Sequence, residues 1–422
     1  QPISRIYIKP SLAQLEANKT FVLSATATLV NGCSAVGNIT VNNNNNISSA
    51  ASTDWATATA WLPSKTLPDI TKCVIVKTPV NIKGNANFEA FNVLVLPSGT
   101  LNINDDPTKL ASLKIQNELT NRGPATAVNV NSGGSLIQVN DNAANSGSIT
   151  VKRNINVSAD RKQYNYLISP VVGANLKTNI YRDGSGNPVS SPSVQYHLES
   201  SNYFGESSGA YIAGRGLAVK EPLTGSGPFY VVFAGPPTNG AVSFNATNSA
   251  PSVIGPGVAS RGYNLIGNPY PSNMDLLTFY TGNGGEAGGL SSTFRFWDNH
   301  NNITYDQQGS NYSGNSYSSY NVVSATGTAA TSDAGTAGSS KKTPGRHVSV
   351  GQGFMTRIIG VPSKTLKFFN NSRTKEFEND SFFGKGAGSA MDRYWLKMVT
   401  PDQLAVQMAV VYFEGGSNGF GA

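Results

Sequence analysis

The first residues that could do chemistry form a candidate nucleophile motif at positions 205–209, which read Gly-Glu-Ser-Ser-Gly. The Gly-x-Ser-x-Gly pattern places a reactive serine on a sharp turn between a strand and a helix, and it needs a histidine base. Residues 210–214 are too short and too rich in glycine for that helix. The histidines of the chain, which lie in no matching acid signature, are His197, His300 and His347. We therefore interpret the motif as a chance match in a chain rich in Gly and Ser.

Acidic residues that could serve a polysaccharide-degrading enzyme are few in the repetitive part of the chain. Such an enzyme uses clustered carboxylates, or Ca²⁺ with a basic residue, in one groove. Between positions 73 and 157 the acids are Glu89, Asp105, Asp106, Glu118 and Asp141. Asp105 and Asp106 directly precede Pro107 and could bind a cation, but we prefer to interpret them as a turn-initiating pair.

A third pattern interleaves aromatic rings with Asn, Asp and Gln after position 296. The candidate ligand-binding residues in it are Trp297, Asp298, Tyr305, Tyr312 and Tyr317. Sugar recognition uses such a mixture, because ring faces stack on apolar C–H surfaces while amides pair with hydroxyls. The same mixture is typical of an exposed hairpin whose rings cover a sheet edge, which is the interpretation that we prefer.

Metal and cysteine chemistry has little support in the sequence. Asp298 and Asp306, together with nearby Asn carbonyls, could hold a structural Ca²⁺, and we expect no other cofactor. The two cysteines, Cys33 and Cys73, fit no zinc site. If the protein is exported, a disulfide between them would tie the N-terminal segment to the strands that follow, although spacing alone leaves open whether the sulfurs meet.

The composition predicts an all-β protein. Charged residues make up 13% of the chain, against roughly 25% in an average soluble protein. Gly, Asn, Ser and Thr replace them, and these residues disfavour helices. The net charge of +7 is spread along the chain without a basic face, so we expect no nucleic-acid binding. No apolar run approaches the roughly 18 residues of a membrane helix, so we expect a chain that does not span a membrane.

The pattern of strands and turns divides the chain into three parts. Residues 1–54 form an N-terminal β segment that ends in an Asn-rich loop or linker at positions 42–46. Residues 55–157 contain very short apolar runs with similar corners, such as Pro-Ser-Gly-Thr-Leu at 97–101 and Asn-Ser-Gly-Gly-Ser-Leu at 131–136. Short strands with recurring Gly corners favour a parallel β-helix or solenoid, and a meandering sandwich remains the alternative.

Strands lengthen and aromatic residues become more frequent in residues 158–422. Gly-Pro, Asn-Pro and Asn-Gly turns separate these strands, which predicts an antiparallel β-sandwich or jelly roll. Within this part, residues 309–345 are rich in Ser, Gly, Ala and Thr, and we interpret them as a low-complexity loop.

Residues 261–275 carry the most specific phrase of the sequence, with a core from Gly262 to Ser272 that reads Gly-Tyr-Asn-Leu-Ile-Gly-Asn-Pro-Tyr-Pro-Ser. This phrase resembles a signature of large cell-surface proteins of Bacteroidetes that are cargo of the type IX secretion system. Further phrases resemble the same family in the same order, at 149–153, 164–170, 350–354, 368–373 and 393–396. The resemblance covers roughly residues 50–422. The core phrase itself indicates a structural role, since Pro269 and Pro271 favour a rigid extended turn around which Tyr263 and Tyr270 could pack.

The resemblance implies an exported protein that is extracellular or on the cell surface. Its partners would be the outer-membrane translocon and the shuttle protein of the export machinery, reached mostly through a C-terminal sorting domain that this chain does not include. We expect a non-enzymatic protein that works in adhesion or surface display. The alternatives are a lectin-like module that binds a surface polysaccharide and a β-helix enzyme that degrades one.

Overall fold

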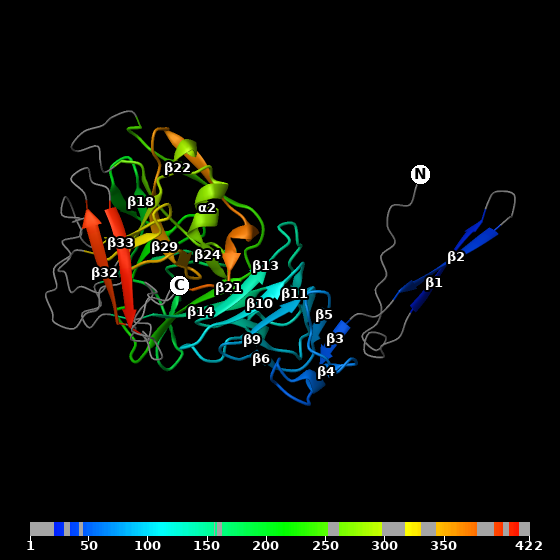
Figure 1. The fold of residues 1–422 in the computed structure, drawn as a ribbon. Coiled ribbons are helices and arrows are strands. Elements are labelled where there is room, and N and C mark those ends of the chain that lie inside the picture. Colours follow the sequence, from blue (N-terminus) through cyan, green and yellow to red (C-terminus); the bar gives the residue numbers. More distant parts are fainter. Residues whose placement is uncertain are drawn as a thin grey trace.

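The computed structural model describes residues 21–28, 34–41, 45–155, 157, 163–251, 261–297, 317–330, 343–377, 392–399 and 405–412. About 44% of the structure is strand and 7% is helical. The all-β prediction is therefore confirmed. In Figure 1 the solenoid forms the blue-to-cyan part of the ribbon, and the antiparallel sheets form the green-to-orange part. No helix among the described residues is both long and apolar enough to cross a membrane.

Residues 45–155 wind into a parallel β-solenoid of about three turns. The first face of the solenoid consists of β3 (Asn45–Ser48), β5 (Cys73–Val76), β8 (Asn92–Val95) and β11 (Leu119–Asn121), with β4 (Trp61–Leu62) antiparallel to β3 at its edge. The second face consists of β6 (Val80–Ile82), β9 (Leu101–Ile103), β12 (Val128–Val130) and β14 (Ile149–Ile155). The third face consists of β7 (Asn87–Ala90), β10 (Ala111–Ile115) and β13 (Gly134–Gln138). Short 3₁₀ turns interrupt the connections at η1 (Ala58–Ala60) and η2 (Ala125–Ala127).

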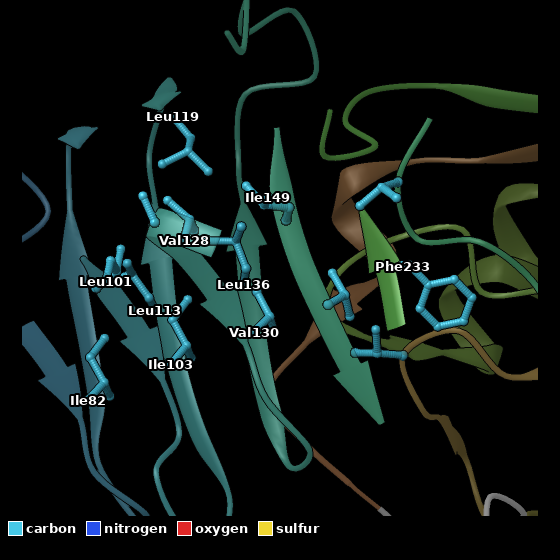
Figure 2. Close-up of a cluster of buried hydrophobic side chains, with 14 of the residues drawn as sticks. Ile82, Leu101, Ile103, Leu113, Leu119, Val128, Val130, Leu136, Ile149 and Phe233 are labelled. Atoms are coloured by element: carbon cyan, nitrogen blue, oxygen red, sulfur yellow. The ribbon is translucent and has the colours of Figure 1, made fainter. Parts of the chain in front are cut away.

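The solenoid holds together because apolar side chains of successive turns stack inside it. Successive residues of a strand point to opposite faces, so alternate residues face the interior. The parallel register of the second face aligns Val80 with Leu101 and Val128, and it aligns Ile82 with Ile103 and Val130. All six side chains are buried, and Figure 2 shows most of them as one continuous column. The Gly corners behave as the sequence predicts, since Gly133 and Gly147 have φ angles of +78° and +83°.

The outward positions of the same strands carry a ladder of asparagines. Asn81, Asn102 and Asn129 occupy the same register position on three successive turns. The amide of Asn102 donates to Oδ1 of Asn81 at 2.8 Å, and the amide of Asn129 donates to Oδ1 of Asn102 at 2.9 Å. Each turn is therefore tied to the next by a side-chain hydrogen bond as well as by the backbone.

Two tryptophans close the N-terminal end of the solenoid. The rings of Trp55 and Trp61 are fully buried and meet edge to face at 4.8 Å, while Trp55 also stacks on Phe88 at 5.7 Å. The indole N–H of Trp61 donates to the carbonyl of Trp55 at 2.9 Å. A solenoid needs such a cap because its first turn has no preceding turn to cover its apolar interior.

The Asn-rich tract differs from the prediction of a loop or linker at residues 42–46. Asn45 and Asn46 begin β3, which pairs in parallel with β5. Asn46 is only 1% exposed, and its amide donates to the Thr66 carbonyl at 2.9 Å. Partners supplied by distant residues thus outweigh the low strand preference of asparagine.

The second half of the described chain consists mainly of antiparallel sheets. One four-stranded sheet contains, in order, β15 (Tyr164–Leu167), β20 (Leu217–Lys220), β18 (Val194–Leu198) and β19 (Tyr203–Glu206). A five-stranded sheet contains β23 (Tyr263–Gly267), β29 (Gly353–Arg357), β25 (Thr293–Trp297), β26 (Tyr317–Asn321) and β27 (Thr326–Thr328). Smaller sheets pair β22 (Val242–Thr247) with β30 (Ser363–Phe368), and β24 (Asn273–Asp275) with β28 (His347–Val348) and β31 (Arg373–Thr374).

The remaining elements extend or flank these sheets. Three strands continue the second solenoid face, namely β21 (Phe229–Gly235), β16 (Tyr181–Arg182) and β17 (Pro188–Val189). The described helical elements of this half are α2 (Leu276–Gly282), η3 (Glu286–Gly288) and η5 (Asn370–Ser372). Two separate hairpins are formed by β1 (Phe21–Thr28) with β2 (Ser34–Val41), and by β32 (Asp392–Val399) with β33 (Ala405–Tyr412).

Strands β26 and β27 correct the prediction that residues 309–345 form a loop throughout. β26 pairs with β25, and β27 pairs with β26. Ser318 and Tyr320 alternate with more exposed neighbours and are buried against the rest of the sheet. A segment rich in small polar residues can therefore be a strand when a neighbouring strand supplies its hydrogen bonds and every second side chain is covered.

The sheet that ends the solenoid also begins the antiparallel half. β14 pairs in parallel with β12 on one side and antiparallel with β21 on the other. One buried apolar cluster accordingly extends from Trp55 to Val350. The hydrogen-bonded sheet therefore continues across the boundary predicted at residues 157 and 158.

The signature phrase lies at this junction. The Pro271 carbonyl accepts a hydrogen bond from the backbone N–H of Leu136 in β13 at 2.7 Å, so the phrase docks directly on the solenoid. The buried amide of Asn268 donates to the carbonyls of Ser272, Val348 and Ser349 at 2.6, 3.3 and 3.2 Å. One side chain thus connects two stretches of backbone, the turn at Ser272 and the segment Val348–Ser349.

Arg373 in β31, about a hundred residues after the signature phrase, completes the junction. Its guanidinium lies 5.0 Å from the ring centre of the buried Tyr270, donates to Oγ of Ser272 at 3.2 Å and donates to the carbonyl of Leu136 at 2.6 Å. Burial lowers the pKa of Arg373 to about 10, which still leaves the group charged at neutral pH. The signature, the solenoid and β31 therefore meet at one buried cation.

We predict that the substitution Trp55→Ala lowers the free energy of unfolding by about 3–5 kcal/mol, because it opens a cavity at the N-terminal end of the solenoid, which Trp55 and Trp61 cover. The matched control is Leu62→Ala, at a residue that is 40% exposed in the same region and should change stability little. Urea unfolding followed by circular dichroism measures both variants. Equal effects of the two substitutions would contradict the capping role.

We predict that Asn268→Ala lowers the free energy of unfolding by about 1–3 kcal/mol, since it leaves buried carbonyl groups without donors. Asn142→Ala, at an exposed turn, is the control and should be close to neutral. Denaturant titration of both variants tests the prediction, and a loss no larger than that of the control would show that the signature does not hold the junction.

Candidate functional site

A pocket of about 150 Å³ opens between the four-stranded and the five-stranded sheets. Hairpin β18–β19 forms one side of it, and one face of β23, β29, β25 and β26 forms the other. The residues that line the pocket are His197, Asn202, Phe204, Tyr263, Arg295, Tyr317 and Met355. They come from separate strands and turns, so only the packing of the sheets brings them together.

The alternation of the five-stranded sheet explains which of its residues reach the pocket. Phe294, Phe296 and Phe354 point to one face and pack in a buried aromatic cluster, where Phe294 and Phe354 meet edge to face at 5.7 Å. The register pairs Arg295 with Met355 and Trp297 with Tyr317 on the opposite face. That second face is partly covered by the four-stranded sheet, and the uncovered part is the pocket.

Aromatic rings form the floor behind the pocket. Trp297 is only 6% exposed, and its ring stacks on Tyr166 at 5.8 Å and meets Tyr317 edge to face at 5.2 Å. The hydroxyl groups of Tyr166 and Tyr317 lie 2.6 Å apart and share a hydrogen bond. Trp297 therefore supports the pocket wall, while Tyr317 reaches the pocket itself in a fixed orientation.

Positive charge concentrates around Tyr263. The guanidinium carbons of Arg295 and Arg357 lie 4.9 and 5.3 Å from the centre of its ring, within the range of cation–π attraction. Nε of Arg357 is engaged by the carbonyl of Arg261 at 3.1 Å. Among the described residues, Arg295 forms no ion pair with a carboxylate. The guanidinium of Arg295 is thus the cation that the pocket offers to a ligand.

The acidic residue that follows β18 is bound by backbone N–H groups rather than by Arg295. Glu199 is buried, and its carboxylate accepts hydrogen bonds from the backbone N–H groups of Ser249 and Gly262 at 3.0 and 2.7 Å. These bonds hold the carboxylate on the chain segments behind Tyr263. The pocket therefore offers the guanidinium of Arg295 beside aromatic rings, although the charge of Glu199 still acts on His197.

His197 supplies an uncharged polar group to the pocket. Its Nε2 lies 3.0 Å from Oδ1 of Asn202, and its ring meets Phe204 edge to face at 5.1 Å. Burial lowers the pKa of His197 below its ordinary value, although the Asn202 side chain, the charge of Glu199 and the backbone of Tyr263 act in the opposite direction. The ring is therefore mainly neutral at neutral pH.

The structure brings together two of the five ligand-binding residues expected from the sequence. Trp297 and Tyr317 are adjacent on β25 and β26, whereas Asp298, Tyr305 and Tyr312 lie outside the described residues. The calcium site that was expected at Asp298 and Asp306 also lies outside them. The described residues contain no group of three or more His, Cys, Asp or Glu side chains placed to hold a metal ion.

Sequence reasoning missed the other side of the pocket. His197, Asn202, Tyr263 and Arg295 carried no shared motif, and Tyr263 was noted only as a packing residue of the signature. The alternation Thr-Phe-Arg-Phe-Trp at 293–297 was a usable signal, because it places Arg295 and Trp297 on the same face of one strand. No local pattern indicated that His197 would lie opposite them.

The serine and the acidic pair that the sequence offered for catalysis or cation binding accept hydrogen bonds from backbone N–H groups. Oγ of Ser207, the central serine of the candidate nucleophile motif, accepts from the N–H of Gly209 at 3.1 Å, and no helix follows it in residues 207–216. Asp105 accepts from the N–H of Gly84 at 3.0 Å, and Asp106 accepts from the N–H of Thr108 at 3.0 Å. The turn interpretation is confirmed for Asp106, whereas Asp105 connects its loop to Gly84 of the preceding solenoid turn.

Cys73 lies on the first solenoid face, where the amide of Asn92 lies 3.8 Å from its sulfur. Burial raises the pKa of the Cys73 thiol. Cys33 lies outside the described residues, so its disulfide with Cys73 stays a prediction.

Protonation of His197 provides a test of the pocket geometry. A lowered pKa in the folded state means that the stability contributed by the neutral ring is fully present above the unfolded pKa and is lost as the pH falls through the folded pKa. We predict that the free energy of unfolding falls more steeply from about pH 7.5 to about pH 5 in the wild-type chain than in a His197→Gln variant. Urea titrations at both pH values measure the two slopes, and parallel slopes would contradict the burial of this ring.

Comparisons with known proteins leave one informative match. No curated protein and no solved structure matches the chain. A family model described as a domain of unknown function, DUF8693, matches residues 46–422, which include the solenoid, the junction and the pocket. The match covers far more than half of the sequence, and the chain belongs to the DUF8693 family.

Proposed function

We propose that this protein is a secreted, non-enzymatic cell-surface protein that works in adhesion or surface display. It is exported as cargo of the type IX secretion system. In this proposal its export partners are the outer-membrane translocon and the shuttle protein. The protein then remains extracellular or attached to the cell surface.

The observation that carries the proposal is the position of the signature phrase. Its core residues hold the junction between solenoid and antiparallel sheets, through the Pro271 carbonyl, the Asn268 amide and the ring of Tyr270. A phrase that resembles a family signature therefore corresponds to an architectural element rather than to an unconstrained loop. This position supports the proposal that the chain shares the role of the proteins whose signature it resembles.

The rigid connection between the two halves also suits surface display. β14 belongs to the solenoid and to the antiparallel extension at once, so the two parts share a hydrogen-bonded sheet and a continuous core. Such a body can present loops at a fixed distance from its attachment point, because bending it would break sheet hydrogen bonds.

The second candidate function is that of a lectin-like module that binds a surface polysaccharide. The pocket favours it, since Tyr317, Phe204 and Met355 offer apolar surface beside the polar groups of Asn202 and His197. A polysaccharide-degrading β-helix enzyme ranks third. Of the acids that could serve it, Asp105 accepts a backbone hydrogen bond from the preceding solenoid turn and Asp106 accepts one within its own turn.

We predict that an epitope tag inserted at the exposed turn around Asn142 is accessible to antibody on intact native cells and becomes inaccessible when the type IX translocon is inactivated. Whole-cell immunolabelling measures the accessibility, and a periplasmic protein that stays unlabelled in both strains is the control. A label that persists without the translocon, or one that appears only after lysis of wild-type cells, would overturn the proposed route.

A further inference from the structure

The pocket between the sheets has the features of a site for a charged ligand, and its charge is the first of them. Arg295 is held over the ring of Tyr263 at 4.9 Å and has no carboxylate partner among the described residues. A guanidinium presents parallel N–H groups that match the two oxygens of a carboxylate. An anionic group on a ligand would therefore gain a directional contact at Arg295.

The shape of the pocket limits the size of the ligand. Its volume of about 150 Å³ equals that of an engineered cavity that holds one benzene ring, about 150 Å³. The pocket is partly open to solvent, so substituents of a six-membered ring could extend outward. The bound group is thus one ring of a longer molecule or a single small ring.

The walls favour a sugar ring over an aromatic or a wholly apolar ring. Phe204 and Met355 provide apolar contact for C–H groups, whereas Asn202, His197 and the hydroxyl of Tyr317 provide polar contacts for ring hydroxyls. Nδ2 of Asn202 has no hydrogen-bond acceptor among the described residues, and its Oδ1 faces Nε2 of His197 at 3.0 Å. A hydroxyl-bearing ligand would satisfy the amide.

We propose that the pocket binds a single acidic sugar residue, a uronic acid, within or at the end of a polysaccharide. Arg295 pairs with the sugar carboxylate, Asn202 and Tyr317 contact the hydroxyls, and Phe204 and Met355 pack against the ring. This inference rests on the carbohydrate-binding candidate function and goes beyond it, because it assigns the site, the charge of the sugar and the residue that selects it.

The test measures binding of trigalacturonate, its neutral counterpart galactotriose, a sulfated galactose oligosaccharide and acetate to the full chain by isothermal titration calorimetry. We expect trigalacturonate to bind best. The substitution Arg295→Gln should weaken trigalacturonate binding about tenfold or more, because it removes a charge-assisted contact, and it should leave weak galactotriose binding unchanged. Tyr317→Phe should weaken both saccharides to a similar degree.

The matched control is Arg215→Gln. Arg215 also lies over an aromatic ring, that of Tyr196 at 5.6 Å, but it does not line the pocket, so its loss should not change binding. Circular dichroism and urea unfolding check that each variant folds. If Arg295→Gln fails to fold, Arg295→Lys keeps the charge without the forked geometry and should still weaken trigalacturonate binding selectively.

The outcomes separate this inference from the function on which it rests. Equal binding of trigalacturonate and galactotriose, unaffected by Arg295→Gln, would retain carbohydrate binding and overturn the acidic-sugar assignment. Absence of binding by every saccharide would overturn both. Acetate binding as tight as trigalacturonate binding would overturn the assignment of the ligand as a sugar. Preference for the sulfated oligosaccharide would overturn the assignment of its anionic group as a carboxylate and indicate a sulfate.

Discussion

The stacked apolar column inside the solenoid is the constraint on which the rest of the structure depends. Each turn buries its interior only against neighbouring turns, so both ends need a cover. Trp55 and Trp61 cover the first turn. At the other end β14 pairs with β21, and the apolar column continues into Phe233 and its neighbours (Figure 2). The antiparallel half is therefore the second cap of the solenoid as well as a body with its own core.

Buried arginines organise the polar part of this second cap. Arg153 donates to the carbonyls of Asn131 and Gly134 at 2.7 and 2.8 Å, at a solenoid corner with no further parallel turn beyond it. Burial lowers the pKa of Arg153 to about 9, and the group remains charged at neutral pH. Arg373 serves the neighbouring edge in the same way through Leu136. A misdocked junction would leave these charges buried without acceptors, which is strongly unfavourable, so the arginines favour one arrangement of the two halves.

The pocket follows from incomplete coverage of one sheet face. Tyr166 packs against Trp297 and Tyr317 where the four-stranded sheet covers the five-stranded one. Where this coverage ends, the same face presents Arg295 and Tyr263 to the β18–β19 hairpin. Arg295 and Arg357 are tolerated on this largely aromatic face because both guanidinium groups lie over the ring of Tyr263.

The sequence by itself determined the all-β class, the solenoid and the turn role of Asp106, because these depend on local alternation, Gly corners and a side chain that bonds to adjacent backbone. It could not reveal that Asn45 and Asn46 start a strand or that Tyr317 lies in one, since distant strands supply their partners. The pocket depended most on tertiary structure. Strand alternation shows which residues share a face, but which faces meet is decided by packing between segments such as 194–204 and 293–297, and no local pattern carries that information.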